Sequence, residues 1–283
     1  WFEREGFLDL AAREWAKDAG GRNALERWQN KIRHLRSFLR GWAKHLSGVY
    51  KAEKEQLLAL IQALDVKEEN TVFLATELHT KLDAEMRLKE LLREEELKWA
   101  LRAKVRKVVQ GDANTQFFHM IANGKHRKKR IFQLEQDEGT IIGQDNLKLY
   151  ITEYYKRLFG PPEENCVSLD ESRIQDVPQL TAVENDVLTA PFSEKEVFEA
   201  ISKMKCNKAP GPDGFPAEFY KKCWHIIKGD LMPMFHDLFS GHLQLFQLNF
   251  GTITLLPKKT EAVRIEQFWP ICLLNVSFKI FTK

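Results

Sequence analysis

Apolar residues recur at helical spacing along the first hundred residues, with charged residues between the apolar positions. The first run ends at Gly20-Gly21, the second continues to a polar break at residues 67–70, and a third spans residues 74–99. Residues three and four apart share one face of a helix, so the pattern predicts a short helix and two long amphipathic helices. We expect the two long helices to form an antiparallel hairpin. A coiled-coil surface for a partner remains an alternative interpretation of the same stripes.

Shorter elements follow in the middle of the chain. Two apolar runs at residues 131–134 and 140–142, joined across Asp137-Glu138-Gly139, predict a small β-hairpin. An amphipathic helix is expected over residues 144–159, because Gly160-Pro161-Pro162 must stop it. The polar residues 161–190 are typical of a linker.

The last ninety residues combine helices with two short strands. Ser193 and Glu196 have the spacing of a capping box, which predicts a helix from there to about residue 204. Residues 208–216 contain three prolines and two glycines and must form a loop. Helices are expected over residues 217–227 and 231–240. Apolar runs at 253–259 and 268–274 predict a strand pair, with Lys258 near its tip. The fold class is therefore mainly α with small β elements, that is α+β.

Composition sets the broad class of the protein. The 283 residues include 43% hydrophobic residues, enough for one to three domains with real cores. The four cysteines form no C-x-x-C pair, and no secretory signal or long uncharged apolar segment is present, which indicates a reducing location in the nucleus or cytoplasm and no membrane partner. Because Trp1 opens the chain and Lys283 interrupts an amphipathic pattern, we expect a fragment. The pattern leaves the oligomeric state open.

Positive charge is concentrated in one segment, although the net charge of the whole chain is only +3. Ten cations and one acidic residue, Asp112, lie between residues 98 and 130. The aromatic pair Phe117-Phe118 lies between the two basic halves, and basic residues mixed with aromatic ones suit a phosphate backbone and exposed bases. A solvated helix end with both phenylalanines in a core is the alternative. The candidate nucleic-acid-binding residues are Lys98, Arg102, Lys104, Arg106, Lys107, Lys125, Arg127, Lys128, Lys129 and Arg130.

Three ordered segments, "KAPGPDGFPAEFYKKCW", "ITLLPKK" and "FWPICLLNVSFKI", resemble the fingers of reverse transcriptases encoded by plant LINE-type (non-LTR) retrotransposons. Upstream, "GDANTQFFH" at residues 111–119 is similar to a stretch that precedes the polymerase in the same polyproteins. The resemblance runs from about Phe2 to Lys283. With the hydrophobic pattern it divides the chain into a helical hairpin (1–110), a basic connector with a small hairpin and helix (111–160), a linker (161–190) and an incomplete fingers region (191–283), without palm or thumb.

The resemblance implies a role in RNA-directed DNA synthesis, with an RNA template and a DNA primer as partners. It implies that Lys258 contacts the triphosphate of the incoming nucleotide, and that residues 208–214 line the template or nucleotide side of the fingers. The nucleotide-binding candidates are Lys258, Lys208, Gly211, Asp213 and Gly214. The family's Mg²⁺ is held by palm carboxylates, and no two aspartates are adjacent anywhere in this chain. We therefore expect no cofactor, no catalytic residue and no polymerase activity in these residues alone.

The sequence departs from the family pattern in the second strand. Trp269 stands where the family has arginine, and Cys272 stands where it has serine. An indole lacks the charged donors of a guanidinium, so we expect weaker phosphate binding and a Trp269 that packs instead. Cys223 and His225, with His236 and His242, have no structural zinc spacing. A noncatalytic nucleic-acid-binding or coiled-coil interaction module is the alternative function.

Overall fold

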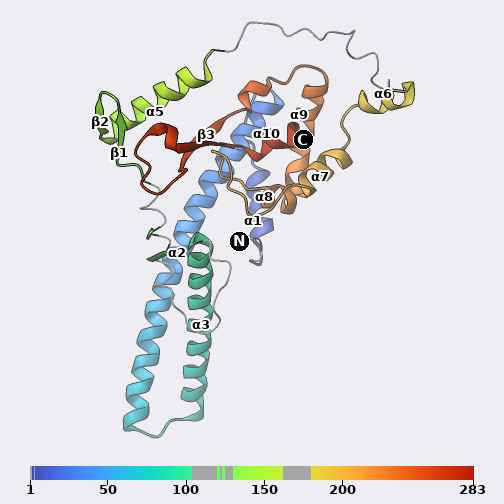
Figure 1. The fold of residues 1–283 in the computed structure, drawn as a ribbon. Coiled ribbons are helices and arrows are strands. Elements are labelled where there is room, and N and C mark those ends of the chain that lie inside the picture. The colour runs from blue at the N-terminus through green and yellow to red at the C-terminus, as the bar shows by residue number, and fades with distance from the viewer. Residues whose placement is uncertain (1, 3, 104–119, 122, 125–129, 162–179) are drawn as a thin grey trace. The chain divides into compact units, whose positions relative to one another are not determined.

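The computed structural model describes residues 2, 4–103, 120–121, 123–124, 130–161 and 180–283. These residues are mainly helical with two small antiparallel sheets (Figure 1), which confirms the α+β class. The chain forms two compact units, one of residues 1–38 with 132–283 and one of residues 39–131. Packing thus associates the first helix with the C-terminal region, a grouping that the linear pattern does not show. The predicted domain boundaries at residues 110, 160 and 190 stay a prediction.

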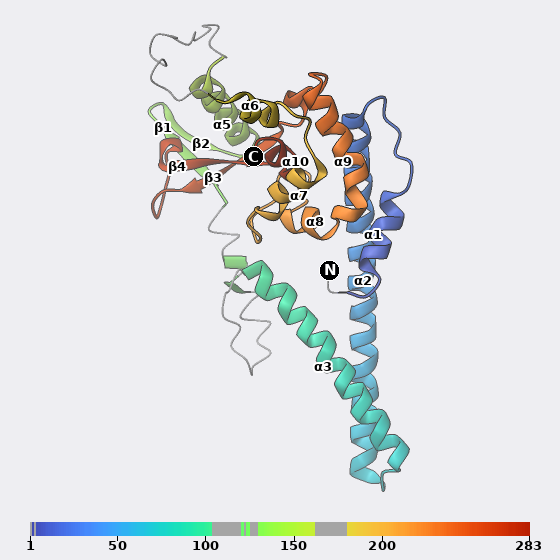
Figure 2. The same ribbon diagram turned by 90° about the vertical axis from the view of Figure 1, so that its right-hand side faces the viewer.

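The unit of residues 39–131 is built on a helical hairpin. It is made by α2 (Ala24–Asn70), from residue 39 onward, and α3 (Ala75–Ala103), which lie side by side in Figures 1 and 2. The ion pairs between the helices join later residues of α2 to earlier residues of α3, as Asp65–Lys81 and Lys54–Glu95 show. This confirms the antiparallel arrangement. These ion pairs include Lys54–Glu95 at 2.9 Å, Glu53–Arg87 at 2.7 Å and Asp65–Lys81 at 2.6 Å. Ala84 and Leu91 of α3 are buried, whereas Leu74, Leu78 and Leu82 of the predicted apolar stripe are exposed, so α3 packs within the chain over only part of its apolar surface.

In the other unit, α1 (Phe7–Trp15) packs beside the first turns of α2 and α9 (Trp224–Phe239). Trp15 is buried, with its ring 5.3 Å from that of Trp28 in an edge-on arrangement. Its indole Nε1 donates to Asp230 Oδ2 at 2.8 Å, and Lys31 Nζ reaches the same oxygen at 2.8 Å. One carboxylate on α9 therefore ties that helix to α1 and α2, which lie some 200 residues earlier in the sequence.

Short helices surround α9. The capping box is present as predicted: Ser193 Oγ accepts from the Glu196 amide, and α7 (Glu194–Ser202) begins there. The predicted boundary between the next two helices is wrong, because α8 (Ala217–Lys222) ends at Cys223 and α9 continues through Gly229. The contacts of Asp230 hold that stretch helical. Pro233 removes the hydrogen bond to the carbonyl of residue 229 and crowds that carbonyl, yet α9 continues to Phe239.

The predicted β-hairpin and the helix after it are confirmed. β1 (Gln133–Gln136) pairs with β2 (Gly139–Ile142), and α5 (Gln144–Phe159) ends at Gly160, whose φ is +62°. The predicted linker, of which residues 162–179 lie outside the described residues, contains a further short helix, α6 (Ala182–Leu188), that begins with its own capping box and buries no residue.

The second sheet is the predicted strand pair. β3 (Gly251–Pro257) and β4 (Phe268–Leu274) pair antiparallel, from Gly251 opposite Leu274 to Pro257 opposite Phe268. The 3₁₀ turns η2 (Leu245–Gln247) and η3 (Ile265–Gln267) precede the two strands, and α10 (Val276–Phe281) follows β4. The loop between the strands is tied to β1, because the Glu135 amide donates to the Val263 carbonyl at 2.8 Å. Within the described ranges, no helix is both long and apolar enough to cross a membrane.

Candidate functional site

The loop of residues 208–214 is seated on the start of α10. The Asp213 amide donates to Asn275 Oδ1 at 3.0 Å. At Gly211 a Cβ would come within 2.5 Å of the Leu274 carbonyl carbon and of Asn275 Oδ1, so only glycine permits this approach. Gly214 has a φ of +82°, a conformation that also favours glycine. The loop is thus fixed by close backbone contact with the end of β4.

Asp213 lies above a small buried polar cluster. Its Oδ1 accepts from the Phe215 amide at 3.0 Å, and the Tyr220 and Ser277 side chains beneath it are buried. Burial raises the pKa of the Asp213 carboxyl, although the Phe215 amide and the charge of Arg36 oppose the shift. Burial, and then the neighbouring Asp213, raise the pKa of Tyr220 well above its ordinary value. Tyr220 therefore stays neutral and acts as part of the support of the loop.

A pocket of about 380 Å³ opens beside this cluster. Its wall combines guanidinium groups, amide side chains and an aromatic ring, together with Asp213 and Pro212 of the loop. Such a lining can take up a planar polar group that carries negative charge. Its polar and aromatic lining residues outside the loop are Trp28, Gln29, Arg33, Arg36, Gln247, Phe250, Asn275 and Ser277.

Lys258 lies one residue beyond the end of β3, at the tip of the strand pair as predicted. Its amide donates to the Gln267 carbonyl at 2.8 Å, which extends the ladder by one bond. Its Nζ donates to the Glu266 carbonyl at 2.6 Å and lies 4.6 Å from the centroid of the Trp269 ring. Trp269 was expected to pack, but 59% of its surface is exposed. The indole stays outside because it belongs to the open face of β4 and supports the lysine there.

The structure does not bring Lys258 beside the loop. Gly211 lies against Leu274, at one end of the β3–β4 pair, and Lys258 follows Pro257 at the other end. Six residues of strand at about 3.4 Å each separate the two places by roughly 20 Å. Lys208 is exposed at the start of the loop, and Cys272 is exposed on β4. The nucleotide-binding assignments therefore fall into two separate places, and their roles stay predictions.

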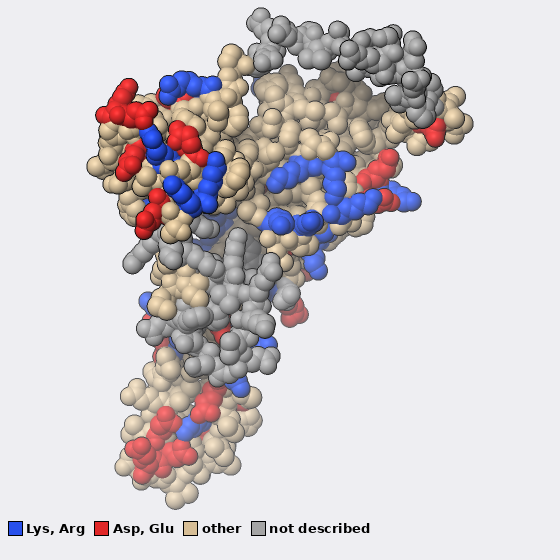
Figure 3. Space-filling view, viewed as in Figure 1, with Lys and Arg blue, Asp and Glu red and all other residues tan. Residues whose placement is uncertain are grey.

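A further group of cations contains Lys208, which the sequence analysis named, and other lysines that it did not name. Figure 3 shows lysine and arginine atoms gathered over the surface formed by α7, α8 and the segment between them. Lys221 Nζ donates to the carbonyls of Ser202 and Met204, at 2.9 and 2.6 Å, and so fixes the end of α7 against α8. The alternation in "KMKCNK" at residues 203–208 was the available signal. The exposed members of the group are Lys203, Lys205, Lys208 and Lys222.

Most of the predicted basic segment lies outside the described residues. Lys98 is exposed on α3, where its Nζ lies 3.4 Å from Ser47 Oγ, and Arg130 is exposed before β1. Arg102 belongs to α3, and nothing is described of its side chain. The candidates outside the described residues are Lys104, Arg106, Lys107, Lys125, Arg127, Lys128 and Lys129, together with Phe117 and Phe118.

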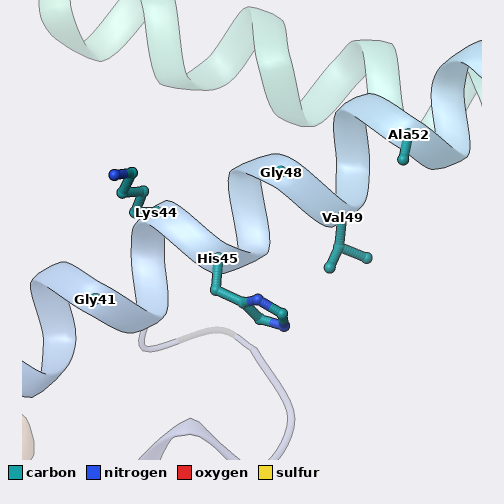
Figure 4. A pocket seen from close by; sticks show the side chains of 6 residues that line it. All are labelled: Gly41, Lys44, His45, Gly48, Val49 and Ala52. Atoms are coloured by element: carbon teal, nitrogen blue, oxygen red, sulfur yellow. The ribbon is translucent and has the colours of Figure 1, made fainter.

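The hairpin unit has a shallow depression on α2, shown in Figure 4. Gly41 and Gly48 contribute no side chain there, and Val49 and Ala52 add only small apolar groups. Across the described part of the chain, no three His, Cys, Asp or Glu side chains are grouped so that they could hold a metal ion. Burial raises the pKa of the Cys223 thiol to about 12, so this cysteine is an inert core residue.

The chain is similar to a protein encoded by a transposon. Over 263 residues it is 28% identical to the Transposon TX1 uncharacterized 149 kDa protein of Xenopus laevis. The match covers 88% of this chain and 19% of that protein, so the chain spans about a fifth of the length of its relative. No protein-family model matches the chain.

Proposed function

We propose that this chain is the fingers side of an RNA-directed DNA polymerase from a non-LTR retrotransposon of the plant LINE type. In this role it contacts RNA template, DNA primer and nucleotide phosphates. The similarity to a transposon protein along most of the chain supports an origin in such an element. We further propose that these residues do not catalyse polymerisation by themselves.

One structural observation carries the proposal. The three segments on which the resemblance depends lie in one compact unit: the loop of residues 208–214 rests on Asn275, and β3 pairs with β4 along seven residues. Asp213 and Asn275 are 62 residues apart in the sequence, so the fold uses the loop and the end of β4 together. This joint use is what a nucleic-acid-handling part of a polymerase requires.

The residues suggest how contacts to nucleic acid would be divided. Lys258 presents a compact charge at the tip of the strand pair, and Lys208 is the first residue of the loop. The basic residues between 98 and 130 supply phosphate contacts that do not depend on sequence. A polymerase also needs two divalent metals held by carboxylates. The described residues do not fit such a metal pair, because they hold no cluster of metal ligands.

Salt-dependent RNA binding tests the proposal. The full chain, titrated against a fluorescein-labelled 20-nucleotide RNA, should give anisotropy curves whose affinity falls steeply with salt, by about 0.7 in log–log slope per phosphate contact. Changing Lys104, Arg106 and Lys107 to Gln should lower that slope by about 2. The control changes three exposed lysines of the hairpin, Lys44, Lys51 and Lys89, to Gln. Absent or salt-independent binding, or an equal loss in both variants, would defeat the proposal.

A second candidate function is helix-mediated association, which one observation favours. Leu78, Leu82 and Met86 follow one another at four-residue spacing on α3 and are 47%, 49% and 59% exposed. Such an apolar row can pack against a second copy of the hairpin. Sedimentation velocity checks this: a concentration-dependent dimer that is lost on changing Leu78 and Leu82 to Gln would support it, and a monomer at all concentrations would exclude it.

A further inference from the structure

Neighbouring residues of β4 lie in opposite environments. Phe268 is 6% exposed, whereas Trp269, the next residue, is 59% exposed. Successive side chains of a strand point to opposite faces, so one face of the β3–β4 pair is packed at this point and the other is open. The open ring of Trp269 is thus a large apolar surface that remains available for contact with a ligand.

The open face continues along the strand pair. Residues opposite each other in an antiparallel pair share a face, so Trp269 lies with Leu256, and Ile271 lies with Thr254. Ile271 is 41% exposed, and Thr254 is exposed as well. The face therefore offers an aromatic ring, an aliphatic side chain and a hydroxyl in a row on a sheet surface.

Positive charge lies directly at the ring. The ammonium of Lys258 is 4.6 Å from the centroid of Trp269 and is held there by its hydrogen bond to the Glu266 carbonyl. Lys259 is exposed next to it. An exposed lysine is usually free to move, but here two contacts fix the ammonium beside an aromatic ring.

These features favour a base with its phosphate over a triphosphate. One ammonium that already donates to a carbonyl leaves few donors for a polyphosphate, and an indole adds a single N–H. A nucleobase, in contrast, can stack on the exposed indole, as bases do on aromatic residues of other sheet surfaces. The phosphate of the same strand then lies near the lysines. A carboxylate of a protein could also pair with the ammonium, but a nucleotide of a strand matches both features at once, the ring by its base and the ammonium by its phosphate.

We propose that the Trp269 face of the β3–β4 pair binds single-stranded nucleic acid, with one base stacked on the indole and the adjoining phosphate beside Lys258 and Lys259. This deepens and rests on the proposed function. It assigns to the tip of the strand pair a contact with a nucleic-acid strand, in place of the triphosphate contact that Lys258 was expected to make. The recognition is independent of base sequence, because every base has a face that can stack.

The experiment compares two probes of equal charge. One is a fluorescein-labelled 10-nucleotide DNA strand, and the other is the same strand with abasic sites throughout. The full chain should bind the strand with bases about tenfold more tightly, or more. Trp269→Ala should remove most of that difference while leaving the affinity for the abasic strand unchanged. Because Trp269 is exposed, this variant should keep its fold, which circular dichroism checks.

Three further variants sharpen the result. Trp269→Phe keeps an aromatic face and should stay within about threefold of the wild type. Lys258→Gln should lower the salt slope for both probes by about 1 without abolishing the preference for bases. Phe246→Ala removes another exposed aromatic residue, 73% open and outside the strand pair, and should change nothing.

The outcomes separate this inference from the proposed function. Equal affinity of the wild type for both strands, or an unchanged preference in Trp269→Ala, overturns the stacking site while salt-dependent RNA binding still stands. Loss of all nucleic-acid binding by the wild type overturns both. A Trp269→Ala variant that changes the sedimentation coefficient and not the preference assigns the face to a protein contact instead, and also overturns the inference.

Discussion

The loop of residues 208–214 and the tip of the β3–β4 pair belong to the same compact unit, but different forces hold them. The loop approaches Asn275 so closely that residue 211 has room only for hydrogen, and the side chains beneath it are buried. At the tip, the Lys258 side chain and Trp269 contact each other in solvent, and the ammonium donates to the Glu266 carbonyl. Close packing holds the loop in place, whereas exposed polar contacts hold the side chains at the tip.

The difference indicates where substitutions should act. A change that crowds the closely approaching loop backbone or removes its anchor at Asn275 should lower the free energy of unfolding before it alters any binding. A change at the tip removes contacts worth little in water, so it should alter ligand binding and leave stability nearly intact. Four measurements test this contrast, in order of decreasing effect.

The largest effect is expected from Gly211→Ala. The added methyl would overlap the Leu274 carbonyl carbon and the Asn275 side chain, so the loop or α10 must shift. Overpacking of this kind costs about 1–3 kcal/mol or more of unfolding free energy. Urea denaturation followed by circular dichroism measures the loss.

Gly229→Ala is the matched control for this substitution. A Cβ at residue 229, inside α9, would meet nothing within 4 Å. Alanine is the better helix former, so this variant should gain about 0.5–1 kcal/mol. If both variants shift stability in the same direction, steric contact does not fix the loop.

Asn275→Ala should have the next largest effect. The variant removes the acceptor of the Asp213 amide and leaves that donor partly buried without its partner. The expected loss of unfolding free energy is about 1–2 kcal/mol. Asn249→Ala, at an exposed position ahead of β3, should stay within about 0.5 kcal/mol of the wild type. Equal losses in the two variants would contradict an anchoring role of Asn275.

Asp213→Asn should raise the free energy of unfolding, in contrast to Gly211→Ala and Asn275→Ala. The pKa of the folded Asp213 is raised above its ordinary value of 3.8, so the unfolded chain loses its proton first as pH rises. This carboxyl therefore lowers stability progressively from about pH 3.8 upward, and the loss stays constant above the folded pKa. An amide keeps the acceptor for the Phe215 amide and carries no charge. The variant should be more stable than the wild type at pH 7 and equally stable at pH 3.

Thermal unfolding of Asp213→Asn and the wild type at several pH values checks this. A constant difference between the two proteins across the whole range would mean that the charge of Asp213 is not the cause.

Lys258→Ala should have the smallest effect on stability. The exposed contact between its ammonium and Trp269 contributes about 0.5–1 kcal/mol at most. Thermal unfolding should hardly change, whereas the salt slope of nucleic-acid binding should fall. If Lys258→Ala lowered the free energy of unfolding as much as Gly211→Ala does, the loop and the tip would not differ in what stabilises them.

Local chemistry explains what the sequence predicted well. The capping box at Ser193, the stop at Gly160 and the β3–β4 pair depend on residues close together in the chain, and all three are observed. The antiparallel long helices also follow from their periodicity and the short break between them. Residues 208–216 were predicted to form a loop because their prolines and glycines disfavour both helix and strand.

Long-range contacts explain what the sequence did not predict. The continuous course of α9 depends on Trp15 and Lys31, some 200 residues away, which hold Asp230. The distance between Lys258 and Gly211 follows from the strand register, which the pattern alone does not fix. Phe268 is buried, and Trp269, on the opposite face of the strand, is exposed. Which of the two faces is buried depends on the elements that pack against the sheet, and the strand sequence alone does not fix it.

Helix α2 has a consequence for how the molecule folds. Starting a helix is the costly step and lengthening it is cheap. The turns around Trp28 are fixed by α1 and α9, so they can serve as the nucleus from which the remaining turns grow. The later turns of α2 therefore need no nucleus of their own.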